Sequence, residues 1–431
     1  MNRTLDSISP EVRDGGGRPE RVLIVGLDRD DPREWPADES LDELERLVDT
    51  AGGVVVGRVV QRRPQPHPRH YVGTGKLEEI RALIPEFQVD TVVFDDELTP
   101  GQARNLEREL SVHIVDRTQV ILDIFAGRAQ TREGRLQVEL AQLEYLLPRL
   151  VGKGIELSRL GGGIGTRGPG ETKLETDRRR IRRRIADLKA EVDKVRKHRA
   201  LHRRRRKKQQ QPVVALVGYT NAGKSTLLSA LTGAEVFIED RLFATLDPTV
   251  RAASDAGGQG FLLVDTVGFI NKLPHQLVAA FRATLEEVLE ADLIVHVLDI
   301  SSSRFDQERS VVLGVLAELG AGSRPIITAC NKVDLLPPHV AGAIVASIPN
   351  SVAISAAKGW GLDELVRLIE ASLPDPPKLY RFSVPYSAGN VLDWLHENGE
   401  VREARYEPDA VHVTVEIPSR LAERVSSLLS T

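Results

Sequence analysis

The chain has 431 residues, which is too many for one hydrophobic core and is typical of three or four domains. Hydrophobic residues make up 41% and charged residues 28%, a balance that argues against a wholly disordered protein. The single cysteine, Cys330, excludes an intramolecular disulfide and a zinc or iron–sulfur site built from cysteines. There is no run of about 18 uncharged apolar residues for a membrane span and no apolar export segment near the N-terminus, so we expect a cytoplasmic protein.

The net charge of −4 conceals an uneven distribution of charge along the chain. Residues 177–208 contain 17 lysines and arginines against four acidic residues, a local net charge of +13 that leaves −17 for all other residues. Charge concentrated in one segment favours contact with a polyanion such as nucleic acid. The alternative is an ordinary helix surface that its charges keep solvated.

Residues 1–20 lack periodicity and are predicted to be a flexible tail. From 21 to 125, short apolar runs alternate with helical patterns, which predicts an α/β subdomain with parallel strands. The segment Gly73-Thr74-Gly75-Lys76 is not interpreted as a phosphate loop, because its glycine spacing is wrong and Leu77 occupies the place of the magnesium-binding hydroxyl. The expected strands are 21–27, 52–60, 89–96 and 111–117, and the expected helices are 40–51, 76–84 and 100–110.

Residues 126–211 are predicted to form an antiparallel helical hairpin that ends in a basic arm. Leucines recur on one stripe between 136 and 150, and apolar residues recur by four and three from 181 to 195, as in a two-helix coiled coil. Six glycines within positions 161–170 separate the helices and predict a mobile loop at the hairpin tip, with a simple linker as the alternative. The basic run 203–208 and three glutamines then indicate a helix end and a domain boundary.

A strand followed at once by a glycine-rich loop marks the start of a nucleotide domain, predicted to cover 212–375. The apolar run 213–217 leads into the pattern G-x-x-x-x-G-K-S, and a helical pattern begins directly after it. Backbone N–H groups of such a loop surround the β-phosphate at a helix N-terminus, whose dipole favours anions. The lysine reaches the β- and γ-phosphates, while the serine hydroxyl binds magnesium. The loop residues are Gly218, Tyr219, Thr220, Asn221, Ala222, Gly223, Lys224 and Ser225.

Three further motifs follow apolar strands in the order expected of a guanine-nucleotide domain. In the first, Asp265 can hold magnesium through water and the Gly268 amide can contact the γ-phosphate. In the second, the Asp334 carboxylate can accept two hydrogen bonds that guanine offers and adenine does not, while Asn331 can reach the N7 edge of the base and steady the loop. The third supplies backbone amides for the guanine O6. The motifs are Asp265-Thr266-Val267-Gly268, Asn331-Lys332-Val333-Asp334 and Ser355-Ala356-Ala357.

Two positions near the expected γ-phosphate are not settled by spacing. An effector loop should supply a threonine hydroxyl to magnesium, and both Thr245 and Thr249 are of the right type. In many small GTPases a glutamine that orients the attacking water follows the Asp-x-x-Gly motif. Here that residue is Phe269, which cannot form a hydrogen bond through its side chain. We therefore expect slow intrinsic hydrolysis until another group orders the site.

Together these residues resemble the HflX family of ribosome-associated GTPases, in the class related to Obg. The resemblance extends over nearly the whole chain from residue 21, and its most specific part is the segment GGGIGTRGPGE at 161–171. It implies that Thr245 is the magnesium-binding threonine, within the matching segment Phe243-Ala244-Thr245-Leu246-Asp247. We expect magnesium-dependent hydrolysis of GTP, with Lys224, Thr245 and Gly268 as the residues that act on it.

The resemblance also implies the domain order and the partner. The order is an α/β subdomain, a helical hairpin, a GTPase domain and a small C-terminal α/β domain, for which residues 376–431 show the pattern of a ferredoxin-like module. The implied partner is the large ribosomal subunit with its RNA, with the hairpin loop near the peptidyl-transferase centre and GTP-dependent splitting of stalled or idle ribosomes. Alternatives are a GTPase in subunit assembly or tRNA modification, and a binding module for which GTP is only a ligand. The sequence requires no more than a monomer.

Asn221 raises the question of a second cation. Some GTPases of this class lack the catalytic glutamine and carry an asparagine at this place in the phosphate loop, where it helps to bind a monovalent cation. A potassium ion there would supply positive charge where the transition state develops negative charge. The alternative is that Asn221 caps the loop by hydrogen-bonding to its own backbone. The sequence leaves both interpretations open.

Overall fold

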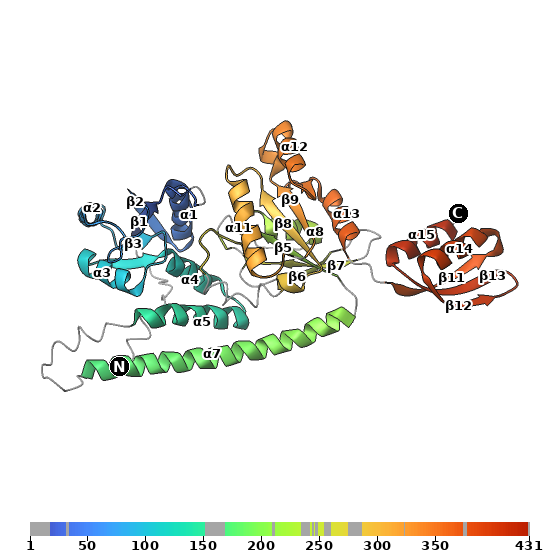
Figure 1. Ribbon diagram of the computed structural model, residues 1–431, viewed down its shortest axis with the longest axis horizontal. Coiled ribbons are helices and arrows are strands. Elements are labelled where there is room, and N and C mark those ends of the chain that lie inside the picture. Colours follow the sequence, from blue (N-terminus) through green and yellow to red (C-terminus); the bar gives the residue numbers. More distant parts are fainter. Residues whose placement is uncertain are drawn as a thin grey trace.

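The computed structural model describes residues 18–31, 34–150, 169–208, 212–233, 242–243, 245, 249–253, 260–274, 287–322, 324–373 and 377–429. Figure 1 shows an N-terminal domain and a nucleotide domain side by side, two long helices running beneath them, and a separate C-terminal domain at one end. Among the described residues no helix is long and apolar enough to cross a membrane.

The N-terminal domain is built on a four-stranded, all-parallel sheet in the order β2-β1-β3-β4. Buried apolar residues lie on both faces of this sheet, as expected where helices cover a parallel sheet from two sides. The last residue of β4, Asp116, accepts a hydrogen bond from the backbone of Gln119 and so caps the next helix. The elements are β1 (Glu20–Asp28), α1 (Ala37–Thr50), β2 (Gly53–Arg62), α2 (Thr74–Glu86), β3 (Thr91–Phe94), α3 (Pro100–Leu110), β4 (His113–Asp116) and α4 (Arg117–Arg128).

The structure contains the predicted strands and helices of this domain and adds one helix, α4, that the sequence analysis did not predict. The segment Gly73–Lys76 forms the start of α2 and not a phosphate loop. The Gly73 amide donates to Gln61 Oε1 at 2.8 Å, and Leu77 is buried in the domain core. An ordinary helix start therefore accounts for this glycine-containing segment.

Helices α5 (Arg132–Arg149) and α7 (Pro169–Lys208) lie side by side (Figure 1). Arg132 pairs with Glu191 and Glu139 pairs with Arg184, so positions advance along one helix as they recede along the other. Residues 151–168, which contain most of the glycine-rich segment, lie outside the described residues, and so do the side chains of 201–208. The apolar residues between the helices are those expected from the sequence, namely Leu136, Leu140, Ile181, Ile185 and Leu188.

The nucleotide domain contains a six-stranded sheet in the order β10-β9-β8-β5-β7-β6, parallel except for β6. Its central strands are buried apolar runs, and its loops emerge at the carboxyl ends of neighbouring strands, where open α/β sheets bind ligands. The strands are β5 (Val213–Gly218), β6 (Thr249–Ala253), β7 (Phe261–Asp265), β8 (Leu293–Asp299), β9 (Ile326–Asn331) and β10 (Ser351–Ala353). The helices are α8 (Lys224–Thr232), α11 (Phe305–Glu318), the short 3-10 helix η1 (Val333–Leu335), α12 (Pro338–Ser347) and α13 (Leu362–Ser372).

The C-terminal domain is a three-stranded antiparallel sheet in the order β11-β13-β12, with two helices packed on it. The observed order of strand, helix, strand, strand and helix is the order that the sequence predicted. Its elements are β11 (Lys378–Pro385), η2 (Tyr386–Ala388), α14 (Gly389–Asn398), β12 (Glu400–Tyr406), β13 (Ala410–Ile417) and α15 (Ser419–Leu429).

Candidate functional site

The phosphate loop connects β5 to α8 at the centre of the six-stranded sheet. A Cβ atom at Gly218 would lie 2.3 Å from the Val297 carbonyl oxygen, and one at Gly223 would lie 2.3 Å from Asn331 Nδ2. Gly223 also has a φ of +96°, which disfavours a side chain. Glycine is therefore required at both ends of the loop, and the loop leads directly into the N-terminus of α8. A helix N-terminus in this position attracts anions.

Lys224 brings a buried cation to this loop. Its Nζ donates to the carbonyl oxygens of Gly218 at 3.1 Å and Tyr219 at 2.7 Å. Burial lowers the pKa of Lys224 to about 8, and the nearby Asp265 carboxylate only partly opposes this shift. Burial disfavours the charged form of Lys224. A phosphate bound beside the ammonium would stabilise that form through its negative charge.

Three oxygen-bearing side chains converge next to the lysine. Ser225 Oγ and Thr245 Oγ1 are 2.9 Å apart, and they donate to Asp265 Oδ2 at 2.8 and 2.9 Å. Asp265 Oδ1 is buried without a hydrogen-bond partner, and burial raises the pKa of this carboxyl. Hydroxyl and carboxylate oxygens suit Mg²⁺, so the residues fit a nucleotide-bound divalent cation. Of the two threonines that spacing left open, Thr245 lies in this group, whereas Thr249 starts β6.

The Asp-x-x-Gly segment closes the site from the side of β7. A Cβ atom at Gly268 would lie 3.0 Å from both Cα and Cγ2 of Thr220 and 3.1 Å from Lys224 Nζ. The backbone is pinned to the phosphate loop, because the Thr220 amide donates to the Phe269 oxygen at 2.8 Å and the Phe269 amide donates to the Gly218 oxygen at 3.0 Å. The Phe269 side chain is only 2% exposed and packs in the core. The side chain therefore packs in the core and has no polar atom that could orient a water molecule.

The segments predicted to read the base follow β9 and β10, and Asn331 connects them to the phosphate loop. Asn331 Nδ2 donates to the Ala222 oxygen at 2.8 Å, and its Oδ1 accepts from the Ala356 amide at 3.0 Å. These two hydrogen bonds are the contacts through which Asn331 can steady the loop, as the sequence predicted. Lys332 pairs with Asp299 at 2.7 Å. Asp334 lies in η1, and its carboxylate has no ion-pair partner in the described part of the chain.

Several predicted site residues can offer a nucleotide only their backbone. Thr266 Oγ1 donates to the Leu216 oxygen at 2.7 Å, and Val267 is buried. The Phe243 ring packs edge-on against Phe125 of α4, with 4.6 Å between centroids. The remaining predicted residues of this segment, Ala244, Leu246 and Asp247, lie outside the described residues.

The sequence did not reveal a polar junction between the site and the N-terminal domain. Tyr219 of the phosphate loop donates its hydroxyl proton to Glu43 and accepts a hydrogen bond from the Asn271 amide at 2.6 Å. Lys272, four residues beyond Gly268, pairs with Asp95 at 2.5 Å and with Asp96 at 2.8 Å. The segment that follows Gly268 is thus held by the domain beside it.

The junction is centred on Arg117, whose side chain is only 1% exposed. It pairs with Glu43 and, at 2.7 Å, with Asp95. Burial lowers the pKa of this guanidinium, but the two carboxylates outweigh burial and raise it above the ordinary value. The acidic pair Asp95-Asp96 that follows β3 and the arginine that follows β4 were the only sequence signals, and neither identifies its partner.

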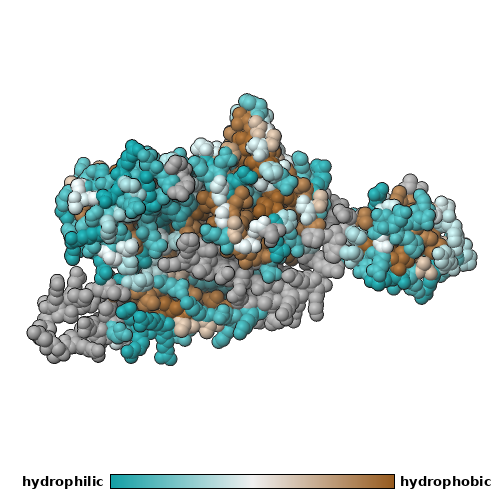
Figure 2. Space-filling view, in the orientation of Figure 1, coloured by the Kyte–Doolittle hydropathy of each residue, from teal (hydrophilic) through white to brown (hydrophobic). Residues whose placement is uncertain are grey.

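The basic surface of α7 and a cavity beside α12 are two further features of the structure. Several arginines of α7, including Arg179, Arg180, Arg182 and Arg183, are exposed to solvent. Figure 2 shows apolar side chains gathered in the upper part of the nucleotide domain, over α12. Beside this helix a cavity of about 610 Å³ lies between β10 and α13.

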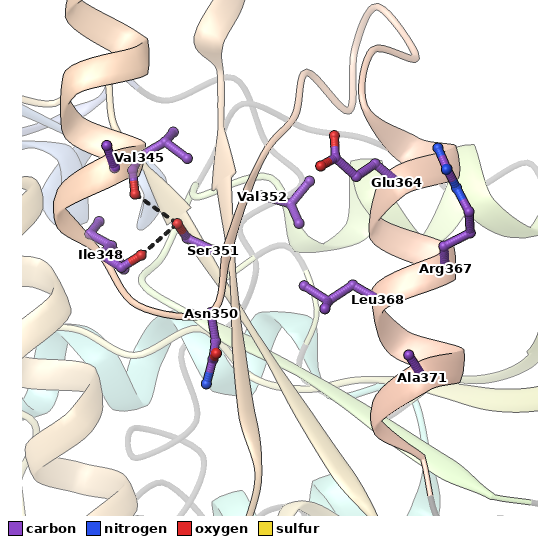
Figure 3. Close-up of a pocket in the computed structure, with 10 residues that line it drawn as sticks. Val345, Ile348, Asn350, Ser351, Val352, Glu364, Arg367, Leu368 and Ala371 are labelled. Atoms are coloured by element: carbon purple, nitrogen blue, oxygen red, sulfur yellow. Dashed lines mark hydrogen bonds between the residues drawn. The ribbon is translucent and has the colours of Figure 1, made fainter.

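Figure 3 shows the side chains that line this cavity, with Ser351 Oγ bonded to the oxygens of Val345 and Ile348 at 2.9 and 2.7 Å. Val352, Leu368 and Ala371 contribute apolar surface. The cavity is at the outer edge of the sheet, whereas the phosphate loop follows the central strand β5. It is therefore separate from the nucleotide loops.

Comparisons with known proteins match three family models to segments between residues 38 and 332. The matching family models are described as GTP-binding GTPase N-terminal (38–126), GTP-binding GTPase Middle Region (128–206) and 50S ribosome-binding GTPase (213–332). GTPase HflX of Caldanaerobacter subterraneus is 50% identical over 95% of this chain and 94% of the relative. GTPase HflX of Escherichia coli is 43% identical over 84% and 88%.

A solved structure also resembles the chain. It is a GTP-binding protein from Sulfolobus solfataricus in complex with GDP, 24% identical, covering 82% of this chain and 98% of that protein with a TM-score of 0.42.

Proposed function

This chain belongs to the HflX family of GTPases, and from that membership we propose that it binds the large ribosomal subunit and splits stalled or idle ribosomes in a GTP-dependent way. The observation that carries the proposal is the match of residues 213–332 to the 50S ribosome-binding GTPase family, in a chain whose other segments also match GTPase families. The basic surface of α7 supports an RNA partner, because clustered lysines and arginines bind phosphate backbones.

We assign the hydrolytic roles as follows. Lys224 and the amides of 218–225 bind the β- and γ-phosphates, and the Gly268 amide binds the γ-phosphate. Asp334 reads the guanine, while Asn331 and the segment 355–357 hold the base loop in place. Ser225, Thr245 and Asp265 would hold a magnesium ion, which neutralises phosphate charge during the transfer.

The same geometry suggests how the nucleotide controls the rest of the protein. Phe243, two residues before Thr245, packs on α4, and Lys272 pairs with Asp95 and Asp96. The segment that contains Thr245 and the segment that follows Gly268 are the two expected to respond to the γ-phosphate, and both contact the N-terminal domain. Loss of the γ-phosphate releases Thr245 and Gly268, and with them the support of that domain. The N-terminal domain and the helical hairpin that follows it would then change how they fit the ribosome. We retain the helical hairpin and the ferredoxin-like C-terminal domain as proposals.

The proposal is tested by light scattering of intact ribosomes mixed with the full-length protein. We expect scattering to fall with GTP and to remain unchanged with GDP, because only GTP orders both segments. Binding to large subunits should be tighter with GppNHp than with GDP. Intact ribosomes after GTP addition, together with sedimentation on immature particles, would instead indicate a role in subunit assembly.

The contribution of the basic arm can be measured separately. Replacing Arg203, Arg204, Arg205 and Arg206 with glutamine should weaken binding to large subunits and flatten its salt dependence, because fewer counterions are released. A matched control replaces Arg402 and Arg405, which pair with Glu416 and Glu403 on the C-terminal domain. An unchanged salt slope in the arm variant would show a solvated helix surface only.

We also propose that Asn221 helps to hold a potassium ion beside the phosphates. Asn221 is exposed at the loop and has a φ of 60°, within the segment that surrounds the β-phosphate. Hydrolysis by the isolated protein should rise when potassium replaces sodium at constant ionic strength, and Asn221→Ala should remove the difference. Equal rates in both salts would leave the loop-capping role.

A further inference from the structure

Two buried side-chain oxygens of the nucleotide site, among the residues that the structure describes, have no hydrogen-bond partner: Asp265 Oδ1 and Thr220 Oγ1. The carboxylate oxygen lies in the group that suits a divalent cation. The threonine hydroxyl has no such explanation. A buried polar group without a hydrogen-bond partner is destabilising, so an unpaired hydroxyl in a ligand site suggests a partner that arrives with the ligand.

Thr220 lies beside the two groups assigned to the γ-phosphate, and its backbone and methyl carbon are its atoms nearest to Gly268. Its Cα and Cγ2 are each 3.0 Å from the Cβ position of Gly268, and Lys224 Nζ is 3.1 Å from that same point. Lys224 and Gly268 are the two groups assigned to the γ-phosphate. Thr220 therefore borders the γ-phosphate as their immediate neighbour, and its amide bond to the Phe269 oxygen holds it there.

The neighbouring hydroxyls already have partners within the protein. The Tyr219 hydroxyl bonds with Glu43 and with the Asn271 amide. Thr266 donates to the Leu216 oxygen, and Ser225 and Thr245 donate to Asp265. Phe269, at the place of the usual glutamine, has no polar side-chain atom and is buried in the core. Among the described hydroxyls around the γ-phosphate, that of Thr220 alone is buried and unpaired.

We propose that the Thr220 hydroxyl positions the water that attacks the γ-phosphate. A hydroxyl donates one hydrogen bond and accepts others, so it can donate to a γ-phosphate oxygen while it accepts from the water. A side-chain amide offers the same combination of donor and acceptor. Thr220 would thus perform from the phosphate loop the orienting task that Phe269 cannot perform from the opposite segment.

The reaction needs no other reagent. The water oxygen forms a bond to the γ-phosphorus while the bond from that phosphorus to the β–γ bridging oxygen breaks, and the bonding electron pair leaves with GDP. One proton of the water passes to an oxygen of the transferred γ-phosphoryl group, which becomes inorganic phosphate, and Thr220 keeps its own proton throughout. The inference rests on GTP hydrolysis by this chain and not on the proposed action on ribosomes.

Single-turnover hydrolysis by the isolated full-length protein tests this role. Thr220→Val replaces the hydroxyl by a methyl group of similar size, and we expect a rate about 100-fold lower, comparable to the loss of one preorganised hydrogen bond to a transition state. Thr220→Ser keeps the hydroxyl and should retain most of the rate. Thr232→Val is the matched control, because Thr232 bonds only to the Leu228 oxygen within α8, and its rate should equal that of the unchanged protein.

Binding measurements separate water positioning from packing and from phosphate binding. In Thr220→Val the affinities for GDP and GppNHp should stay unchanged, while the affinity for GDP with aluminium fluoride, which mimics the transition state, should fall with the rate. An unchanged rate would overturn the proposal, as would a serine variant as slow as the valine variant. An equal loss of GppNHp affinity and rate would also overturn it, by showing ground-state phosphate binding. None of these measurements involves ribosomes, so failure of the splitting proposal would leave their outcome intact.

Discussion

Polar residues cluster beside the sheet of the N-terminal domain and beside the sheet of the nucleotide domain, and the two clusters differ in which groups pair with their buried polar atoms. At the N-terminal sheet, Arg117 pairs with both Glu43 and Asp95, and Lys272 of the nucleotide domain also pairs with Asp95. At the nucleotide sheet, Thr220 Oγ1 and Asp265 Oδ1 are buried without partners in the described chain. In the junction each charged side chain has an opposite charge beside it, although Arg117 Nε lacks a hydrogen-bond partner among the described residues, whereas the two unpaired oxygens of the nucleotide site lie beside the phosphate loop and suit a ligand.

Removing the buried cation of the nucleotide cluster should give the largest effect. Lys224→Met should lower the rate of GTP hydrolysis by about 10³-fold or more, because no other side chain replaces the positive charge at the γ-phosphate. The free energy of unfolding should change by less than about 1 kcal/mol, because burial already disfavours the ammonium. Single-turnover hydrolysis and urea unfolding measure the two quantities, with Lys378→Met in the C-terminal domain as the control. Large destabilisation with retained hydrolysis would reverse the comparison.

Removing the buried cation of the junction should have the opposite balance. Arg117→Met leaves Glu43 and Asp95 buried with one cation fewer, so the free energy of unfolding should fall by about 3–5 kcal/mol. The exposed pair of Arg184 with Glu139 provides a matched control, because Arg184→Met should cost no more than about 1 kcal/mol. Urea unfolding compares the two variants. Equal, small losses would show that the junction contributes no more than a surface ion pair.

The hydroxyl of Tyr219 connects the two clusters, and its removal should have an intermediate effect. Tyr219→Phe leaves Glu43 and the Asn271 amide each without one partner, which should lower the free energy of unfolding by about 1–3 kcal/mol. The ring keeps its stacking on Trp35, so the change isolates the hydroxyl. A double-mutant cycle with Glu43→Gln should show coupling, and additive effects would disprove the connection.

The smallest effect concerns Asp123 of α4, a carboxylate that has no ion-pair partner among the described residues. Burial and the charge of Glu20 raise its pKa from 3.8 to about 7. The folded state therefore binds a proton more tightly than the unfolded state, and this group costs stability increasingly as the pH rises from 4 to 7. Asp123→Asn should raise the free energy of unfolding by about 1–2 kcal/mol at pH 8 and by less at pH 5. The exposed Asp187→Asn is the control substitution, and a pH-independent gain at Asp123 would contradict the shifted pKa.

The nucleotide loops could be predicted from the sequence because each is a short segment at the end of one strand. The pattern from Gly218 to Ser225 needs only its own strand and helix, and the structure places both where spacing required. The choice between Thr245 and Thr249 could not be made from spacing, because it depends on which hydroxyl reaches Asp265 across the sheet. Asn331 was expected to reach the N7 edge of guanine and to steady the loop, and its contacts with Ala222 and Ala356 show which two loops it joins.

The junction was beyond prediction for a different reason. Its partners are separated by 74 residues between Glu43 and Arg117 and by 177 between Asp95 and Lys272, so no local pattern relates them. A charged residue in a single sequence is equally compatible with a solvated surface and with a buried pair. Only the packing of two domains removed these side chains from water and made pairing obligatory.

The sequence by itself therefore determined the order of elements, the nucleotide loops and the family, because these depend on residue types at fixed local spacing. Tertiary structure alone decided which polar atoms the protein satisfies. In the folded chain Phe269 is buried in the core, and the Tyr219 hydroxyl donates to Glu43 of the N-terminal domain. Thr220, beside Gly268, has its Oγ1 buried without a partner among the described residues. Burial raises the cost of an unmade hydrogen bond, and burial is a property of the packed chain and not of any one segment.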